Sequence, residues 1–255
     1  MQRRGTDFDR LVDGLAEVTD AFVGAVSGVD PQATVPTCPG WKVRDLVGHI
    51  GQAYLWSAGL VRSRAAAPPP DPRDEEPGDP REWPTWLGDS AAELVAAVTD
   101  TGPETTVWTF LGDRPARFWL RRMICDATVH VADAAAAGNR PFRISTQLAT
   151  GAIDEGLELI SAAGAADLKP DLGELRGDGQ TLAFRPTEAG PGWLVTRAPG
   201  GVTSERRTAA ADVTVTAPAA DLLLLFSRRI TPDDPRTTIV GDRALLQHWW
   251  ARTAF

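Results

Sequence analysis

Apolar residues in the first two thirds of the chain recur at steps of three and four, the spacing of one buried helical face. The first run of this kind comprises Phe8, Leu11, Leu15, Val18, Phe22 and Val26. The same spacing predicts further helices over residues 41 to beyond 60, 86–98, 115–137 and 146–162. Four long amphipathic helices joined by loops predict a helical bundle, with the fifth helix attached to it or leading out of it.

Proline and glycine divide these helices. Residues 28–41 contain three prolines and end in Pro39-Gly40-Trp41, which predicts a loop before the second helix. Residues 65–84 are rich in proline and acidic side chains and should form an exposed loop. The fourth helix should end before Gly138-Asn139, and Ser145 should lead the fifth.

Beyond Gly164 the pattern changes to short alternating runs rich in β-branched residues, which are typical of strands. Strands are expected at 181–185, 192–197, 211–216 and 237–240, and helices at 218–229 and 242–252. The fold class is therefore α+β with two domains, a helical domain over 1–165 and a small α+β domain over 178–255. The boundary is expected between 165 and 178.

Composition narrows the possible functions. The chain has 255 residues, and its 26 basic and 34 acidic side chains give a net charge of −8. An acidic chain with interspersed charges argues against a nucleic-acid partner, which requires clustered Lys and Arg. No apolar stretch is long enough to cross a membrane, and two cysteines do not make a disulfide framework. We therefore expect a cytoplasmic protein with reduced thiols and a small-molecule substrate, and a monomer by default.

Only three histidines are present, and two of them suggest a metal site. His130 follows Asp126 by four residues, so both side chains lie on one face of the predicted fourth helix. His49 lies beside the apolar stripe of the second helix. Two histidines and a carboxylate suffice for a three-ligand divalent-metal site with open positions. Spacing alone also allows a core histidine and a surface Asp–His pair, and His248 is interpreted as structural.

The segment TVPTCPGWKVRDLVGHIG resembles the N-terminal domain of the mycothiol-dependent maleylpyruvate isomerase family, whose DinB-like fold is an up-and-down four-helix bundle that binds metal. The resemblance implies His49 as the first ligand. It places the other two ligands in RRMICDATVHVADA, at Asp126 and His130. Asp126 stands where the family usually has Glu, and its shorter side chain bears on metal affinity. The stretches ADVTVTAPAADLLLLFSRR and TTIVGDRALLQHWW are similar to the family's sterol-carrier-like C-terminal domain.

This resemblance implies zinc as the metal and mycothiol as a thiol co-substrate. It also implies a functional arginine in the C-terminal domain that binds an anionic substrate, for which Arg228 and Arg229 are equal candidates. Either arginine is also suited to the C-terminus of a helix. Gln52 and Arg122 are candidate partners of the ligands, and Cys125 should point away from the site because it neighbours Asp126 on a helix.

Three functions remain open at this stage. The leading hypothesis is a mycothiol-dependent metalloenzyme, either a cis–trans isomerase or a thiol S-transferase. The second is a metal-dependent enzyme that uses no thiol. The third is a non-catalytic protein that binds a small apolar ligand, which has no need of three metal ligands.

Overall fold

The computed structural model describes residues 7–162 and 165–253. The chain forms two compact units, Met1–Ile144 and Ser145–Phe255. None of the described helices combines the length and apolar character needed to cross a bilayer.

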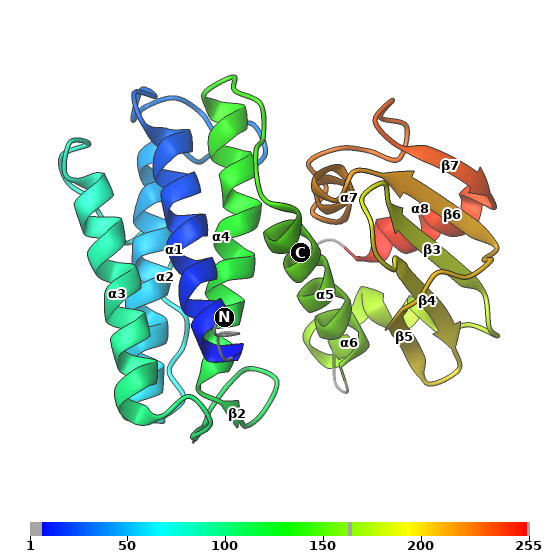
Figure 1. Ribbon diagram of the computed structural model, residues 1–255, viewed down its shortest axis with the longest axis horizontal. Helices are drawn as coiled ribbons and strands as arrows, with labels where there is room; N and C mark the ends of the chain where they lie inside the picture. The colour runs from blue at the N-terminus through cyan, green and yellow to red at the C-terminus, as the bar shows by residue number, and fades with distance from the viewer. Residues whose placement is uncertain (1–6, 163–164, 254–255) are drawn as a thin grey trace, which may run out of the picture. The chain divides into compact units, whose positions relative to one another are not determined.

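The N-terminal unit is the predicted helical bundle. Its helices are α1 (Asp7–Val26), α2 (Val43–Ser63), α3 (Trp83–Thr101) and α4 (Arg117–Ala137). Helices α1 and α2 each contact both α3 and α4, which closes the bundle (Figure 1). The side chains of Leu15, Val18 and Phe22 are fully buried, and each such burial contributes about 1.5–3 kcal/mol before conformational entropy is counted. The periodicity of the first run of apolar residues is therefore confirmed as a core-facing stripe.

A tight turn introduces α2. The backbone N–H of Trp41 donates to the carbonyl of Cys38 at 3.0 Å, and Gly40 has a φ of 82°. Pro39 and Gly40 thus occupy the two central positions of a type II turn, where proline supplies the fixed φ and glycine the positive one. Asp45 then accepts a hydrogen bond from the backbone N–H of Lys42 at 2.8 Å, which satisfies a free donor at the start of the helix.

The loop between α2 and α3 lies against α2. A Cβ at Gly48 would overlap the backbone carbonyl of Glu75, and a Cβ at Gly51 would overlap the indole ring of Trp86 on α3. The indole N–H of Trp56 donates to the carbonyl of Pro68 at 3.1 Å. The two glycines therefore allow the loop and α3 to approach the segment of α2 that contains His49.

A short hairpin precedes α4 and was not predicted from the sequence. Its strands are β1 (Thr106–Val107) and β2 (Arg114–Pro115). Strands of two residues contain too few positions to show an alternating pattern. At the other end of α4, Arg140 donates to the carbonyls of Gly24 at 3.0 Å and Ser27 at 2.7 Å, which satisfies acceptors at the C-terminus of α1.

The C-terminal unit is an α+β domain, as predicted. Its elements are α5 (Thr146–Ser161), α6 (Ala165–Leu168), the 3₁₀ helix η1 (Pro170–Leu175), β3 (Thr181–Pro186), β4 (Trp193–Ala198), β5 (Gly201–Arg206), β6 (Val213–Ala217), α7 (Ala219–Phe226), β7 (Thr238–Gly241) and α8 (Arg243–Arg252). The sheet order is β5-β4-β3-β6-β7. Strands β3 and β6 are parallel and the other neighbours antiparallel. Helices α7 and α8 pack on this sheet over a cluster of Phe184, Phe226 and Trp249, with ring centroids 4.6–5.1 Å apart.

Helix α5 belongs to the C-terminal unit, whereas the sequence placed the boundary at 165–178. The indole N–H of Trp193 on β4 donates to Asp154 on α5 at 2.6 Å. Arg206 on β5 pairs with the same carboxylate at 3.1 Å. Ser145 caps the helix by accepting from the backbone N–H of Leu148 at 3.2 Å. An amphipathic pattern identifies a buried face but not the partner that covers it, so the assignment of this helix required the fold.

Strand β5 was missed by the sequence prediction, because half of its residues are exposed and only Val202 is buried. An edge strand of this kind lacks the alternation that identifies a half-buried strand.

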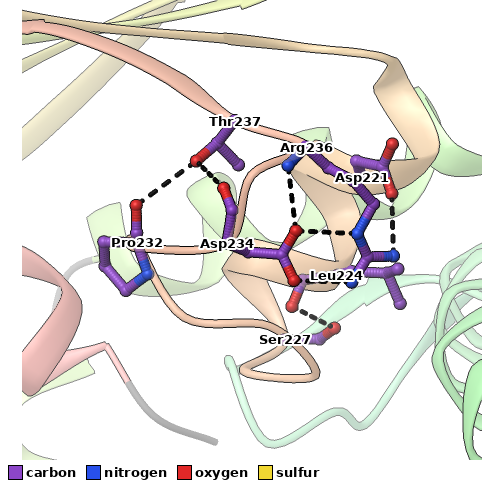
Figure 2. A network of polar contacts seen from close by, with 7 residues as sticks. All are labelled: Asp221, Leu224, Ser227, Pro232, Asp234, Arg236 and Thr237. Atoms are coloured by element: carbon purple, nitrogen blue, oxygen red, sulfur yellow. Dashed lines mark hydrogen bonds and ion pairs between the residues drawn. The ribbon is translucent and has the colours of Figure 1, made fainter.

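A polar network closes the turn that follows α7 (Figure 2). Arg236 donates to Asp234 through Nε and Nη2, both at 2.8 Å, and to Asp221 at 3.2 Å. The hydroxyl of Thr237 donates to the carbonyl of Asp234 at 3.0 Å. The hydrogen bonds from Arg236 lower the pKa of Asp234 to about 2. The contacts of Asp234 lie within its own turn, and the contact with Asp221 joins this turn to α7, so the network stabilises the connection from α7 to β7.

Candidate metal centre

The three predicted ligands converge in the N-terminal unit. Asp126 and His130 project from one face of α4, and His49 projects from α2, which contacts α4. One ligand atom from each lies within 4.8 Å of the others. His49 Nε2 and Asp126 Oδ2 are 3.5 Å apart, and the two imidazole rings have centroids 5.0 Å apart. The fold thus brings together the three donors that the spacing suggested and the family resemblance implied.

A buried carboxylate orients one of these histidines. His130 Nδ1 lies 2.8 Å from Asp133 Oδ2, and the side chain of Asp133 is 0% exposed. Asp133 also accepts from the hydroxyl of Thr37 and, at 3.4 Å, from the thiol of Cys38. A carboxylate on one imidazole nitrogen sets the tautomer and leaves the other nitrogen for a metal. His130 Nε2 is therefore its available donor.

Asp133 is the site residue that sequence reasoning missed. It follows His130 by three residues, so the two side chains lie on the same face of α4. That spacing was the available signal. A single acidic residue within the alanine-rich end of a helix does not otherwise differ from a surface residue, and its burial depends on the loop that provides Thr37 and Cys38.

Trp41 forms a wall beside both histidines. Its ring centroid lies 5.3 Å from that of His49 in an edge-on arrangement and 6.4 Å from that of His130 in a stacked one. The type II turn places Trp41 at this point, and Cys38 in the same turn contacts Asp133. The turn formed by residues 38–41 therefore places two side chains at the candidate centre. Cys38 contacts Asp133, and Trp41 lies beside both histidines.

Arg122 contacts the third ligand. Its Nη2 donates to Asp126 Oδ1 at 2.6 Å, as the sequence suggested for a partner one helical turn away. Burial raises the pKa of Asp126, but the Arg122 guanidinium and the two histidines lower it more, so the pKa is well below its usual range. Asp126 is consequently ionised at neutral pH, as a carboxylate ligand must be.

The pKa of His130 is shifted in the opposite direction, upward. Burial lowers the pKa of His130, but the hydrogen bonds with Asp133 and Cys38 and the charge of Asp126 raise it to about 9 in total. An imidazole must be neutral to bind a metal, so binding of a metal to His130 displaces a proton. The donor set, two imidazoles and one carboxylate, is one that suits zinc and similar divalent ions.

A second group of possible ligands shares His130. The donor atoms of Cys38, His130 and Asp133 also lie within 4.8 Å of one another. Asp133 already accepts from Thr37, Cys38 and His130. These contacts assign Asp133 to the support of His130, and His49, Asp126 and His130 remain the predicted metal-binding group.

Of the other residues that the sequence singled out, Gln52 lies near the predicted ligands, whereas Cys125 and His248 are not among them. Cys125 is buried and is absent from both groups of possible ligands among the described residues. His248 Nε2 donates to the carbonyl of Glu174 at 3.0 Å in the C-terminal unit. Gln52 lines a cavity of about 180 Å³ beside His49 and Asp126.

Both candidate arginines have partners within the C-terminal unit. Arg228 adopts a left-handed backbone with a φ of 62°, donates to the carbonyl of Trp250 and stacks 4.3 Å from that indole. Arg229 donates to the carbonyl of Ser227 at 2.6 Å. The catalytic role suggested for them stays a prediction.

Comparisons with known proteins agree with this arrangement. The model of the mycothiol maleylpyruvate isomerase N-terminal domain matches residues 12–135, and the model of the C-terminal domain of the same family matches residues 147–248. No curated protein matches the chain by sequence.

Two solved structures share the fold. A crystal structure of the mycothiol-dependent maleylpyruvate isomerase is 17% identical with a TM-score of 0.58, over 93% of this chain and 95% of that one. A histidine-to-alanine mutant of that enzyme is 15% identical with a TM-score of 0.60, over the same shares of 93% and 95%. The two family models together match most of the chain, and the chain therefore belongs to the mycothiol maleylpyruvate isomerase family.

Proposed function

We propose that this protein is a mycothiol-dependent metalloenzyme that binds a divalent cation, zinc being the expected one, through His49, Asp126 and His130. The observation that supports the proposal is the convergence of three donor atoms within 4.8 Å from two helices. The family supports mycothiol as the thiol and a small electrophilic molecule as the substrate.

The three ligands and their partners have separate roles. When bound, a divalent ion supplies a positive charge that lowers the pKa of a thiol ligand enough to deprotonate it at neutral pH. His49 and His130 provide neutral nitrogen donors, and Asp133 holds His130 in the orientation that directs Nε2 to the ion. Arg122 fixes one oxygen of Asp126 at 2.6 Å, which would leave the other oxygen to hold the ion.

The reaction class follows from what a thiolate does to an activated double bond. Addition of sulfur converts the double bond to a carbon–carbon single bond. Rotation about that bond, followed by elimination of the thiolate, turns a cis alkene into the trans isomer. Addition without elimination is a thiol transfer. The relatives are isomerases by name, so we propose the isomerisation first and the transfer as the alternative.

Metal analysis tests the site itself. Protein purified without an affinity tag should contain a stoichiometric divalent metal, and His49→Ala and His130→Ala should each lose it. His248→Ala is the matched control, because His248 contacts Glu174 in the other unit and should retain the metal. Metal-free wild-type protein of normal stability, or equal loss in all three variants, contradicts the proposal.

A cobalt-substituted protein tests the thiol. Titration with mycothiol should produce a sulfur-to-metal charge-transfer band, and the band should be absent in His49→Ala. If cobalt binds normally but mycothiol produces no such band, the proposal that mycothiol is the co-substrate is wrong. The function is then that of a metal-dependent enzyme without a thiol co-substrate.

A further inference from the structure

A cavity of about 180 Å³ opens beside the ligands His49 and Asp126, entirely within the N-terminal unit. Most of its lining is apolar, and Trp56, Phe110 and Trp119 provide three aromatic rings. A cavity of roughly 150 Å³ lined by apolar side chains accommodates benzene. This space is therefore sufficient for one aromatic ring with a small substituent.

The aromatic lining is held in place before any ligand arrives. Trp119 and Trp56 pack edge to face with centroids 5.2 Å apart, and Phe110 lies 6.1 Å from Trp119. The indole N–H of Trp119 donates to the carbonyl of Trp108 and that of Trp56 to Pro68, both at 3.1 Å. Because both N–H groups are bonded to backbone, the two indoles present carbon surfaces to the cavity.

The polar side chains of the lining are those of His49, Gln52, Arg122 and Asp126. Arg122 lines the cavity as a cation, and it donates to Asp126. Phe110 is 38% exposed, which is unusual for a large apolar side chain and leaves one ring of the wall accessible. Away from these polar groups the cavity presents apolar walls. It favours a flat apolar group attached to a reactive centre.

We propose that the electrophile accepted at this centre carries an aromatic ring, which the cavity holds between Trp56, Phe110 and Trp119 while the reactive carbon faces His49 and Asp126. This inference rests on the proposed thiol chemistry for the identity of the reaction. The ring site itself rests on the cavity alone.

Two ketones with the same reactive group test it: phenyl vinyl ketone and methyl vinyl ketone. In each, the sulfur of mycothiol forms a bond to the terminal alkene carbon, and the π pair moves toward the carbonyl. The proton of the thiol ends on the adjacent carbon, so no other reactant is consumed. Initial rates are measured with metal-loaded protein after subtraction of the uncatalysed reaction.

The phenyl ketone should have the higher kcat/KM by roughly tenfold or more, because the ring buries additional apolar area. Phe110→Ala should raise KM for the phenyl ketone by about two- to tenfold, the range expected for loss of one aromatic contact. Leu55→Ala is the matched control, since Leu55 is 40% exposed and lies outside the cavity lining. It should leave both KM values unchanged.

A binding measurement separates the two proposals. Propiophenone, the saturated analogue of the phenyl ketone, should bind to the metal-loaded protein in calorimetry, and 2-butanone should not. If Phe110→Ala does not fold, Ala53→Leu takes its place. The leucine fills the cavity from α2 and should weaken propiophenone binding.

Binding of propiophenone without any thiol addition supports the ring site and contradicts the proposed function. Thiol addition with equal kcat/KM for the two ketones, unaffected by Phe110→Ala, overturns the ring site and leaves the proposed function intact. Absence of both addition and binding overturns the ring site as well.

Discussion

Asp133 in the N-terminal unit and Asp234 in the C-terminal unit are both carboxylates with several donors, but their surroundings differ. Asp133 is fully buried and accepts from Thr37 and Cys38, which precede it by 96 and 95 residues. Asp234 is partly exposed and accepts from Arg236, two residues later. One carboxylate receives two of its donors from a remote loop, and the other is bonded by an arginine of its own turn.

This difference separates a group that positions a ligand from one that stabilises a turn. A buried charge is tolerated only when its partners are in place, so Asp133 depends on the assembled bundle and holds His130 only there. Asp234 and Arg236 can form their contacts whenever the local turn forms. Buried charge assembled from remote segments is therefore the feature that distinguishes the candidate metal centre from this turn.

The largest effect is expected for Asp133→Ala. Removal of the carboxylate leaves the buried donors of Thr37 and His130 without their acceptor, and the free energy of unfolding should fall by about 3 kcal/mol or more. Metal affinity should fall by about 10- to 100-fold, because His130 is no longer oriented. Denaturant titration and metal competition measure the two quantities.

The isosteric variant Asp133→Asn supplies the control for this prediction. It retains an acceptor for Thr37 but lacks the charge, so both losses should be smaller than for the alanine variant. Unchanged metal affinity in Asp133→Ala would show that Asp133 is structural only.

The sequence was sufficient for the parts of the fold that depend on regular periodicity. The four helices of the bundle and the main strands follow from the spacing of apolar residues, and the positions of His49 and His130 follow from the same helices. The support of His130 by Asp133 and the cavity beside His49 depend on which loop packs on which helix. Strand β5 was missed because only Val202 among its residues is buried. The unit to which α5 belongs was not evident because an amphipathic pattern does not identify the partner that covers it.

A second prediction tests the close approach of elements around α2. Gly51→Ala should lower the free energy of unfolding by about 1–3 kcal/mol, because the added methyl overlaps the ring of Trp86 and forces it to move. Gly59→Ala is the matched control on the same helix, where a Cβ meets no atom within 4 Å, and it should stabilise by up to about 1 kcal/mol.

Thermal or urea unfolding of both glycine variants measures this contrast. Equal effects of the two substitutions would mean that helix propensity alone governs these positions. The N-terminal unit would then lack the tight packing on which its centre depends.

The smallest effect is expected in the C-terminal unit. Arg236→Ala should lower the free energy of unfolding by less than about 1 kcal/mol at neutral pH, as is typical of exposed ion pairs. The pKa of Asp234 is lowered from 3.8 to about 2 in the folded protein. Its contribution is therefore present above pH 4 and is lost as the pH falls toward 2.

Unfolding of wild type and Arg236→Ala at neutral and at acidic pH checks this sign. The difference between the two proteins should shrink in acid. A difference of several kcal/mol, or one that grows as the pH falls, would contradict the local character of this network.

The contact between Gly48 and the backbone of Glu75 has a consequence for how new specificities arise. The loop that leans on α2 at this glycine also contributes Pro69, Pro70 and Pro72 to the cavity wall, whereas the metal ligands come from helices. This proline part of the wall and the candidate ligands are thus encoded in separate stretches of the gene. Exchange of the loop, by recombination or by design, offers a route to new substrates that leaves the reactive centre unaltered, provided that residue 48 remains glycine.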